Sequence, residues 1–206
     1  MRAMLAKLMG LFLLGLIRVL TGSQARWVGC PPKAEQRLYF ANHQSHADLV
    51  LIWAALPKDL RAVTRPIAAR DYWTSTPFRQ WITTEVFNAV YVSRERSANE
   101  DPLEPLIEAL QQGDSIILFP EGTRGYAEEP QAFKAGLYNL AQRFPSLVLV
   151  PTWINNVQRV MPKGEVVPVP VLCSVTFGAP VHLRDGEERR VFLQRSREAV
   201  IALRDL

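Results

Sequence analysis

Residues 38–56 read LYFANHQSHADLVLIWAAL, a short apolar run followed by a polar turn and a second apolar run. The first run is rich in β-forming residues, which predicts a buried strand. Ser45 followed by Asp48 has the pattern of a capping box, so we expect a helix over residues 46–56. The stretch therefore predicts a strand–turn–helix unit, with His43 in the turn and Asp48 in the first turn of the helix.

The same alternation of apolar strands and helical segments continues along the chain. It is typical of an α/β domain in which helices cover both faces of a mostly parallel or mixed central sheet. Strands are predicted at 38–43, 61–65, 88–94, 115–120, 147–154 and 171–181. Helices are predicted at 46–56, 77–86, 102–112, 133–143 and 187–204.

His43 and Asp48 together have the chemistry of a general base and its orienting carboxylate. A neutral histidine can accept a proton near pH 7, and a carboxylate five positions later can hold one imidazole nitrogen while the other stays free. Two other interpretations remain open. Asp48 can instead be a helix-capping carboxylate, or His43, His46 and Asp48 can form a metal cluster. A metal is disfavoured because the two histidines lie in a turn, and no third distant ligand stands out.

A second polar block, PEGTR (120–124), directly follows the apolar run SIILF (115–119). Such a run predicts a strand inside a mostly parallel sheet, and Pro120 ends it because proline has no N–H for the ladder. Loops at the carboxyl ends of these strands bind ligands in open α/β sheets. Gly122 allows close approach of the backbone to a ligand, and Arg124 can hold a phosphate through two hydrogen bonds. The competing interpretation is an ordinary strand-end turn with solvated side chains.

Taken together, the two blocks resemble the H-x4-D and F-P-E-G-T-R motifs of the glycerolipid acyltransferases, especially the 1-acylglycerol-3-phosphate O-acyltransferases. Three weaker matches are VYVSR (90–94), FKAG (133–136) and VPTWI (150–154). The resemblance extends over residues 38–154. The order of the motifs and their separation along the chain make it specific.

The chain departs from the family pattern in the region that helps to shape the acceptor pocket. Asn88 and Ser93 stand where the family often has glycine and aspartate. Segment 70–81 is rich in tryptophan and lacks the lysine and glycine commonly found there. Its aromatic residues can line an acyl pocket, dock on lipid or simply form core; they are Tyr72, Trp73, Phe78 and Trp81.

The resemblance implies transfer of a fatty acyl group from a thioester of coenzyme A or acyl carrier protein to the free hydroxyl of a lysophospholipid. The implied acceptor is 1-acylglycerol 3-phosphate, and the product is phosphatidic acid. His43 is then the catalytic base, and Asp48 orients it. The implied substrate-binding residues are Arg94, Glu121, Gly122, Thr123, Arg124 and Lys134. No metal or cofactor is expected, because a thioester is already activated.

Three alternatives to this function remain open. The acceptor can be another lysolipid, or water can replace it, which would make the protein an acyl-thioester hydrolase. A non-catalytic membrane-binding protein is the third alternative. The set of His43, Asp48, Glu121 and Arg124 argues against it, because a non-catalytic protein has no physical need for all four.

The composition fits one domain that works beside a membrane. The chain has 206 residues, 48% of them hydrophobic, and a net charge of +4. A mildly basic surface suits anionic lipid or phosphate, and no zinc spacing or RNA-binding strand motif indicates nucleic acid. The two cysteines, Cys30 and Cys173, are expected to be reduced thiols in a cytosolic setting.

The N-terminal segment is apolar but too short for a simple membrane span. The uncharged run over 8–17 would extend roughly 15 Å as a helix, about half of a bilayer core of about 30 Å. Lys7 and Arg18 lie on one helical face, which favours a helix lying in the membrane interface. A signal peptide and a core helix with solvated charged ends are the other interpretations.

We therefore expect three parts in the chain. Residues 1–22 form a membrane-interfacial amphipathic helix, 23–37 form a linker, and 38–206 form the acyltransferase domain. The protein is expected at the cytoplasmic face of the inner (plasma) membrane of a bacterium. Its expected partners are a lysophospholipid, acyl-CoA or acyl carrier protein, and the lipid surface.

Overall fold

The computed structural model of the protein describes residues 2–22, 24–45, 47–93, 101–125, 127, 129–155 and 172–206. At its centre is a seven-stranded sheet with the order β1-β7-β6-β2-β5-β3-β4. The strands are β1 (Gln24–Trp27), β2 (Arg37–Ala41), β3 (Thr64–Ala69), β4 (Val90–Val92), β5 (Ser115–Leu118), β6 (Val148–Asn155) and β7 (Ser174–Phe177). The helices are α1 (Arg2–Thr21), α2 (Asp48–Ala55), α3 (Lys58–Ala62), α4 (Arg70–Trp73), α5 (Pro77–Trp81), the π-helix η1 (Ile82–Val86), α6 (Glu104–Gln111), α7 (Gly136–Arg143) and α9 (Arg189–Ile201).

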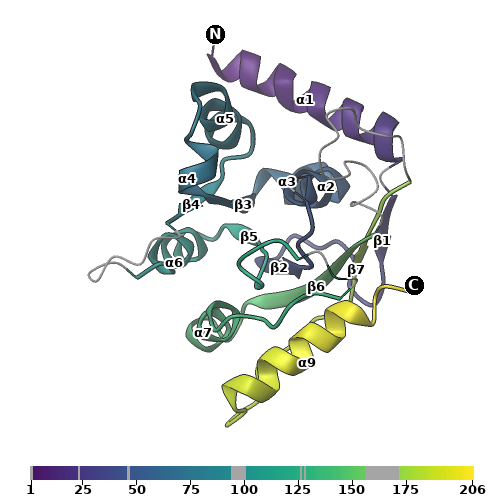
Figure 1. Ribbon diagram of the computed structural model, residues 1–206, viewed down its shortest axis with the longest axis vertical. Helices are drawn as coiled ribbons and strands as arrows, with labels where there is room; N and C mark the ends of the chain where they lie inside the picture. Colours follow the sequence, from purple (N-terminus) through teal and green to yellow (C-terminus); the bar gives the residue numbers. More distant parts are fainter. Residues whose placement is uncertain are drawn as a thin grey trace.

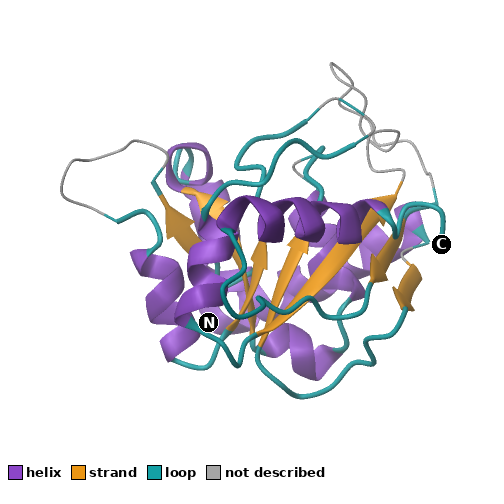
Figure 2. Cartoon of the chain, turned by 90° about the horizontal axis from the view of Figure 1, so that it is seen from below, coloured by secondary structure: helices purple, strands orange, loops and turns teal. Residues whose placement is uncertain are grey.

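The sheet is mixed but mostly parallel, as predicted. All neighbouring strands from β6 through β2, β5 and β3 to β4 are parallel, whereas β7 is antiparallel to β6. Helices lie on both sides of the sheet, with α1 and α2 on one side and α7 and α9 on the other (Figure 1). Figure 2 shows the strands between these helical layers. The α/β fold with an N-terminal apolar helix is therefore confirmed.

The two faces of the sheet carry two separate apolar cores. Along β2, Tyr39 and Ala41 pack with α2, while Leu38 and Phe40 pack with α6, α7 and α9. This alternation follows from the two-residue period of a strand. All of β2 is buried, because it lies in the interior of the sheet and both its faces are covered.

Helices α3 and α4 lie where no helix was predicted, and two strands also differ from the sequence-based expectation. The segment 23–37, predicted as a linker, contains β1, which pairs with β7 at the edge of the sheet. Its side chains are mostly exposed, so it lacks the apolar alternation that marks a strand. The strand predicted at 61–65 lies at 64–69 and contains Pro66. The proline is tolerated because β5 pairs with β3 only as far as Pro66 and β4 pairs from Ile67 onward.

Helix α1 is attached to the domain along one face only. Its buried side begins at Ala6 and ends at Thr21, and its packed residues Leu13 and Ile17 belong to the core around α2. At Gly10 the helix approaches Val86 and Trp53, where an added Cβ would lie 3.4 Å and 3.8 Å from their side chains. The opposite face is apolar and exposed, with Met4, Leu5, Leu8, Leu11, Phe12, Leu16 and Val19. By length and composition alone, α1 could also cross a membrane.

Asn42 fastens the end of β2 to β6. Its side-chain amide donates to the carbonyl of Ile154 at 3.1 Å, and the N–H of Ile154 donates to its side-chain oxygen at 2.8 Å. The residue is 1% exposed, so water cannot replace these bonds. Asn42 therefore extends the pairing of β2 with β6 by one residue and fixes where His43 leaves the sheet.

We predict that Asn42→Ala destabilises the protein by about 3 kcal/mol, because it leaves both buried backbone groups of Ile154 unpaired. Urea unfolding measures this loss. Asn139→Ala on α7 is the control, since the Asn139 side chain makes no hydrogen bond to the described residues, and it should change stability by less than about 0.5 kcal/mol. Equal stabilities of the two variants would contradict the role of Asn42.

Candidate active site

The two polar blocks meet because β2 and β5 are neighbouring parallel strands. Phe40 is the register partner of Leu118, so both strands end at the same edge of the sheet. His43 follows one strand, and the loop from Phe119 to Gly125 follows the other. This is the edge where open α/β sheets bind ligands, as the sequence predicted.

His43 is held by a buried carboxylate. Its Nδ1 lies 2.9 Å from Oδ2 of Asp48, which is completely buried, whereas the His43 side chain is 21% exposed. The same Oδ2 accepts the backbone N–H groups of Gln44 at 2.6 Å and Ser45 at 2.8 Å. Nδ1 therefore carries the proton that faces Asp48, and Nε2 is left as the proton acceptor.

The capping box forms in part. Asp48 lies in the first turn of α2, but the residue before the helix is Ala47, which provides no side-chain cap. Asp48 accepts the Ser45 N–H, as a capping box requires, whereas the Ser45 hydroxyl accepts from Ala47 at 3.2 Å. Asp48 therefore both orders the turn and orients His43, so its two interpretations are compatible.

The loop after β5 fixes His43 from the other side. The ring of Phe119 stacks on the imidazole, with a centroid distance of 4.3 Å and an interplanar angle of 18°. The N–H of Gly125 donates to the His43 carbonyl at 2.8 Å. The N–H of His43 donates to Oε1 of Glu121 at 2.7 Å. Backbone and ring are thus both held by the neighbouring loop.

Glu121 is a buried bridge. It is 2% exposed, and its second oxygen, Oε2, accepts the N–H of Gln131 at 2.7 Å. Burial raises the pKa of this carboxyl, and the two N–H donors from Gln131 and His43 act against that shift. The resemblance implied a substrate-binding role for Glu121. In the structure both of its oxygens accept backbone N–H groups, and Glu121 does not line the cavity of about 990 Å³.

A cavity of about 990 Å³ opens in front of His43. Four of the expected binding residues line it together with the base: Gly122, Thr123, Arg124 and Lys134. Another part of its wall is apolar, with Leu49, Ile67, Val92, Leu103, Leu106, Leu118 and Leu137. The cavity therefore combines a base, cationic side chains and an apolar surface. Arg94 lies outside the described residues, as does His46.

Gly122 is favoured by its backbone conformation, and the side chain of Lys134 passes close to it. Its φ is +71°, in the left-handed region that favours glycine. A Cβ at this position would lie 2.5 Å from Nζ of Lys134 and 2.9 Å from its Cδ and Cε. The lysine side chain therefore passes directly over the glycine. The backbone N–H of Lys134 donates to the carbonyl of Pro120 at 2.8 Å.

The sequence named the aromatic residues of segment 70–81 as a pocket wall among other roles, but it did not point to Arg79. Tyr72, Trp73 and Arg79 line it, whereas Phe78 is 62% exposed. The aromatic content of segment 70–81 is compatible with a pocket, a lipid contact or core, and does not point to one residue. The signal that could have located Arg79 was a cation within an otherwise aromatic segment.

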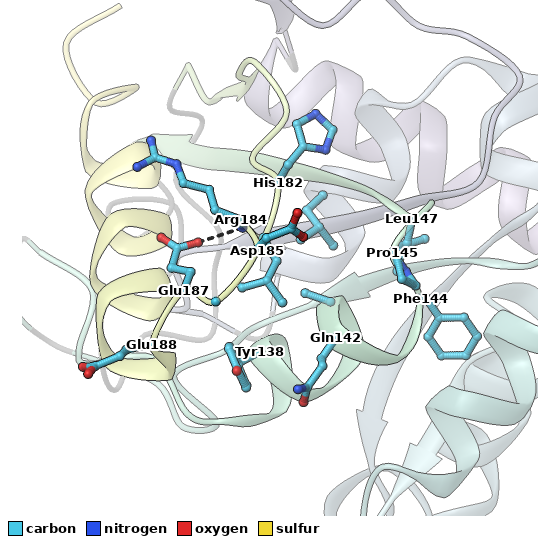
Figure 3. Close-up of a pocket in the computed structure, with 14 residues that line it drawn as sticks. Tyr138, Gln142, Phe144, Pro145, Leu147, His182, Arg184, Asp185, Glu187 and Glu188 are labelled. Carbon is cyan, nitrogen blue, oxygen red and sulfur yellow. Dashed lines mark hydrogen bonds between the residues drawn. The ribbon is translucent and has the colours of Figure 1, made fainter.

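Figure 3 shows a second cavity, of about 490 Å³, and His43 is not among the residues that line it. It lies beside the amino end of β6, between α7 and the turn that leads into α9, and its lining includes Tyr138, His182 and Asp185. Glu187 in this wall pairs with Arg195 at 2.7 Å, and that hydrogen bond is the main cause of its lowered pKa. Its acidic side chain is thus engaged within the fold. Among the described residues, no group of three or more His, Cys, Asp and Glu side chains could hold a metal.

Known proteins resemble this chain in sequence and fold. Over 179 residues it is 26% identical to a 1-acyl-sn-glycerol-3-phosphate acyltransferase of Cocos nucifera, a match that covers 83% of this chain and 56% of the relative. It is 24% identical to the chloroplastic 1-acyl-sn-glycerol-3-phosphate acyltransferase of Arabidopsis thaliana, over 66% of this chain and 36% of the relative. The chain thus matches about half or less of the length of these relatives.

The fold also matches the crystal structure of the 1-acyl-sn-glycerophosphate acyltransferase PlsC from Thermotoga maritima. The TM-score is 0.74 at 22% identity, and the match covers 98% of this chain and 79% of that chain. A sequence profile of the Acyltransferase family matches residues 30–155, which include His43, Asp48 and the loop after β5. The protein therefore belongs to the Acyltransferase family.

Proposed function

We propose that the protein transfers a fatty acyl group from an acyl thioester to the free hydroxyl of 1-acylglycerol 3-phosphate, which gives phosphatidic acid. The observation that carries the proposal is the pairing of His43 with Asp48 at a cavity that also holds Arg124 and Lys134. The names of the relatives from Cocos nucifera and Arabidopsis thaliana support this acceptor. The apolar wall of the cavity suits the acyl chains of both substrates.

His43 acts as the general base in this reaction. Its Nε2 takes the proton of the acceptor hydroxyl, and Asp48 stabilises the imidazolium that forms. The acceptor oxygen attacks the thioester carbonyl and forms the new ester bond. As the C–S bond breaks, the thiolate of the donor takes the proton from Nε2 and leaves as a thiol. The reaction needs no metal or redox cofactor, because the thioester is already activated.

The loop after β5 holds the acceptor phosphate. The guanidinium of Arg124 can give two parallel hydrogen bonds to phosphate oxygens, and Lys134 adds a second positive charge. Thr123 offers a hydroxyl beside them. All three line the cavity of His43, so one bound acceptor can contact the cations and present its hydroxyl to the base.

Helix α1 lies flat in the membrane interface in this proposal. Its contacts with the domain between Ala6 and Thr21 favour this orientation over one that crosses the bilayer. Its exposed apolar face then enters the lipid, and Lys7 and Arg18 contact anionic head groups. In this proposal the domain lies at the cytoplasmic face of the membrane, where a lysolipid can reach the cavity.

We predict that His43→Ala lowers the rate of phosphatidic acid formation by about 100-fold or more, because the positioned base is lost. The assay mixes purified protein, 1-acylglycerol 3-phosphate and acyl-CoA or acyl carrier protein thioester, and mass spectrometry identifies the products. Free fatty acid in place of phosphatidic acid from the wild type would show a hydrolase. A variant that retained more than about a tenth of the rate would contradict the assignment of the base.

The substitution Asp48→Asn tests whether Asp48 acts by orienting His43 or only by stabilising the turn before α2. Asparagine has the same shape, and its side-chain oxygen can take the place of Oδ2, but it lacks the negative charge that stabilises the imidazolium. A large loss of rate with a melting temperature close to that of the wild type would support an orienting role. A fall in melting temperature with an unchanged rate per folded molecule would assign Asp48 to the turn alone.

We predict that Gly122→Ala raises the KM for the acceptor by about tenfold, because the added methyl displaces Lys134 from the phosphate-binding side of the cavity. Gly186→Ala is the matched control. Its φ of +69° gives the same backbone strain, but no atom lies within 4 Å of the added Cβ. Both variants should lose similar stability, and only Gly122→Ala should change the acceptor KM. Similar kinetics in the two variants would show that Lys134 does not contact the acceptor.

We predict that the double substitution Leu8→Glu with Phe12→Glu releases most of the protein from vesicles that contain anionic lipid. The two side chains are 56% and 61% exposed on α1, so charge there opposes membrane insertion without affecting the packed face. Val191→Glu, at a 48% exposed position on α9, is the control and should leave binding unchanged. Sedimentation with vesicles measures binding, and activity on detergent-dispersed substrate should be kept. Retention of the double variant on vesicles would argue against the interfacial helix.

A further inference from the structure

Arg79 contributes to the cavity from the opposite face of the sheet to Lys134. It belongs to α5, which continues into η1, and the η1 residues Ile82 and Val86 pack on the core around α2. Lys134 precedes α7, whose residues belong to the core on the other face. Both side chains line the same cavity as His43. The cavity thus has cations on two separate walls.

The guanidinium of Arg79 is held in one orientation. Its Cζ lies 4.6 Å from the centroid of the Tyr72 ring, in a cation–π contact. Its Nη1 donates to the hydroxyl of Ser75 at 3.0 Å, and its backbone N–H donates to Thr76 at 3.3 Å. The contact with Tyr72 and the hydrogen bond to Ser75 restrict this long side chain before any ligand arrives, so binding costs less conformational entropy.

No described carboxylate forms an ion pair with Arg79. Asp71 and Asp101 line the same cavity and are exposed, yet the structure shows no ion pair between either and Arg79 among the described residues. Its Nε and Nη2 also make no hydrogen bond to the described part of the chain. The Nε and Nη2 groups of Arg79 can therefore donate two hydrogen bonds to an oxyanion. The stacked face stays on Tyr72 while the edge binds the ligand.

The proposed reaction brings two anionic substrates into one cavity. The acceptor carries a phosphate, and so does the donor on coenzyme A or on the phosphopantetheine arm of acyl carrier protein. Arg124, in the loop after β5, and Lys134, which precedes α7, hold the acceptor phosphate in the proposed reaction. A fixed guanidinium on the other wall suits the second, because two phosphates at one cationic cluster would repel each other.

We propose that Arg79 binds a phosphate group of one substrate at a subsite distinct from that of Arg124 and Lys134. The inference rests on the proposed acyl transfer. Arg79 thereby sets which phosphate-bearing substrate the cavity accepts, and Tyr72 positions it. Lysine at this position would keep the charge but lose the planar edge and most of the stacking.

Steady-state kinetics of Arg79→Ala and Arg79→Lys test this proposal. We expect Arg79→Ala to raise the KM for one substrate by about tenfold or more, the effect of losing a charge-assisted hydrogen bond, and to leave kcat within about threefold. Arg79→Lys should show a smaller increase. Arg70→Ala is the control, because Arg70 is exposed on the neighbouring α4 and does not line the cavity. It removes the same charge and should leave both KM values unchanged.

Truncated substrates identify which phosphate Arg79 binds. An acyl thioester of N-acetylcysteamine has no phosphate, and neither does a monoacylglycerol acceptor. If Arg79 binds the donor, Arg79→Ala changes the KM for acyl-CoA but not that for the truncated thioester. If it binds the acceptor, the KM for the phosphate-bearing lysolipid changes and that for monoacylglycerol does not. Unchanged KM values for both full substrates, or equal effects of Arg70→Ala and Arg79→Ala, would overturn the proposal.

Calorimetric binding of coenzyme A and of glycerol 3-phosphate separates this inference from the proposed reaction. It needs no turnover. A wild type that binds one of these ligands but transfers no acyl group would refute the reaction alone, and weaker binding by Arg79→Ala would still support the subsite. A wild type that is active and whose ligand binding is unaffected by Arg79→Ala would refute the subsite alone. Arg79→Gln replaces Arg79→Ala if the alanine variant has a lower melting temperature.

Discussion

One buried carboxylate holds the two halves of the site together. Glu121 accepts the N–H of His43 with one oxygen and the N–H of Gln131 with the other. Burying a carboxylate costs free energy unless hydrogen bonds replace its water, and these two backbone donors supply that replacement. The position of the base and the path of the loop after β5 therefore depend on the same side chain, although it does not line the cavity.

The loop after β5 combines structural and ligand-facing positions in consecutive residues. Phe119 stacks on the imidazole, Pro120 accepts the N–H of Lys134, and Glu121 bridges the loops. Gly122, Thr123 and Arg124 line the cavity, as Phe119 and Pro120 also do. A change to a structural position would move the base, whereas a change to a ligand-facing position would alter substrate affinity. The pattern of the motif thus reflects two different physical demands.

The apolar exterior and the cavity are connected through η1. Helix α1 packs on η1 and α2 with one face and exposes apolar side chains on the other. η1 follows α5, which carries Arg79 into the cavity wall. The element proposed to contact lipid and the wall proposed to select a phosphate therefore share one packing unit. Movement of α1 relative to η1 would displace the cavity wall formed by α5, because packed interiors transmit displacement.

Local sequence alone determined much of this protein. The apolar runs predicted β2, β5 and β6, and the polar residues after β2 and β5 predicted a base and a cationic loop, each at the end of a strand. These predictions succeeded because strand period, proline and capping patterns act between near neighbours in the chain. The spacing of His43 and Asp48 likewise anticipated their contact.

Only the tertiary structure decided which side chains share the cavity. The strand order makes β2 and β5 neighbours, and this brings Glu121 to the backbone of His43 and turns it away from the ligand side. Strand β3 pairs with β5 up to Pro66 and with β4 after it, which allows a proline within the strand. The mostly exposed strand β1 belongs to the sheet because it pairs with β7. Arg79 reaches the cavity because α5 lies beside it. These outcomes depend on contacts between distant segments, which no local pattern encodes.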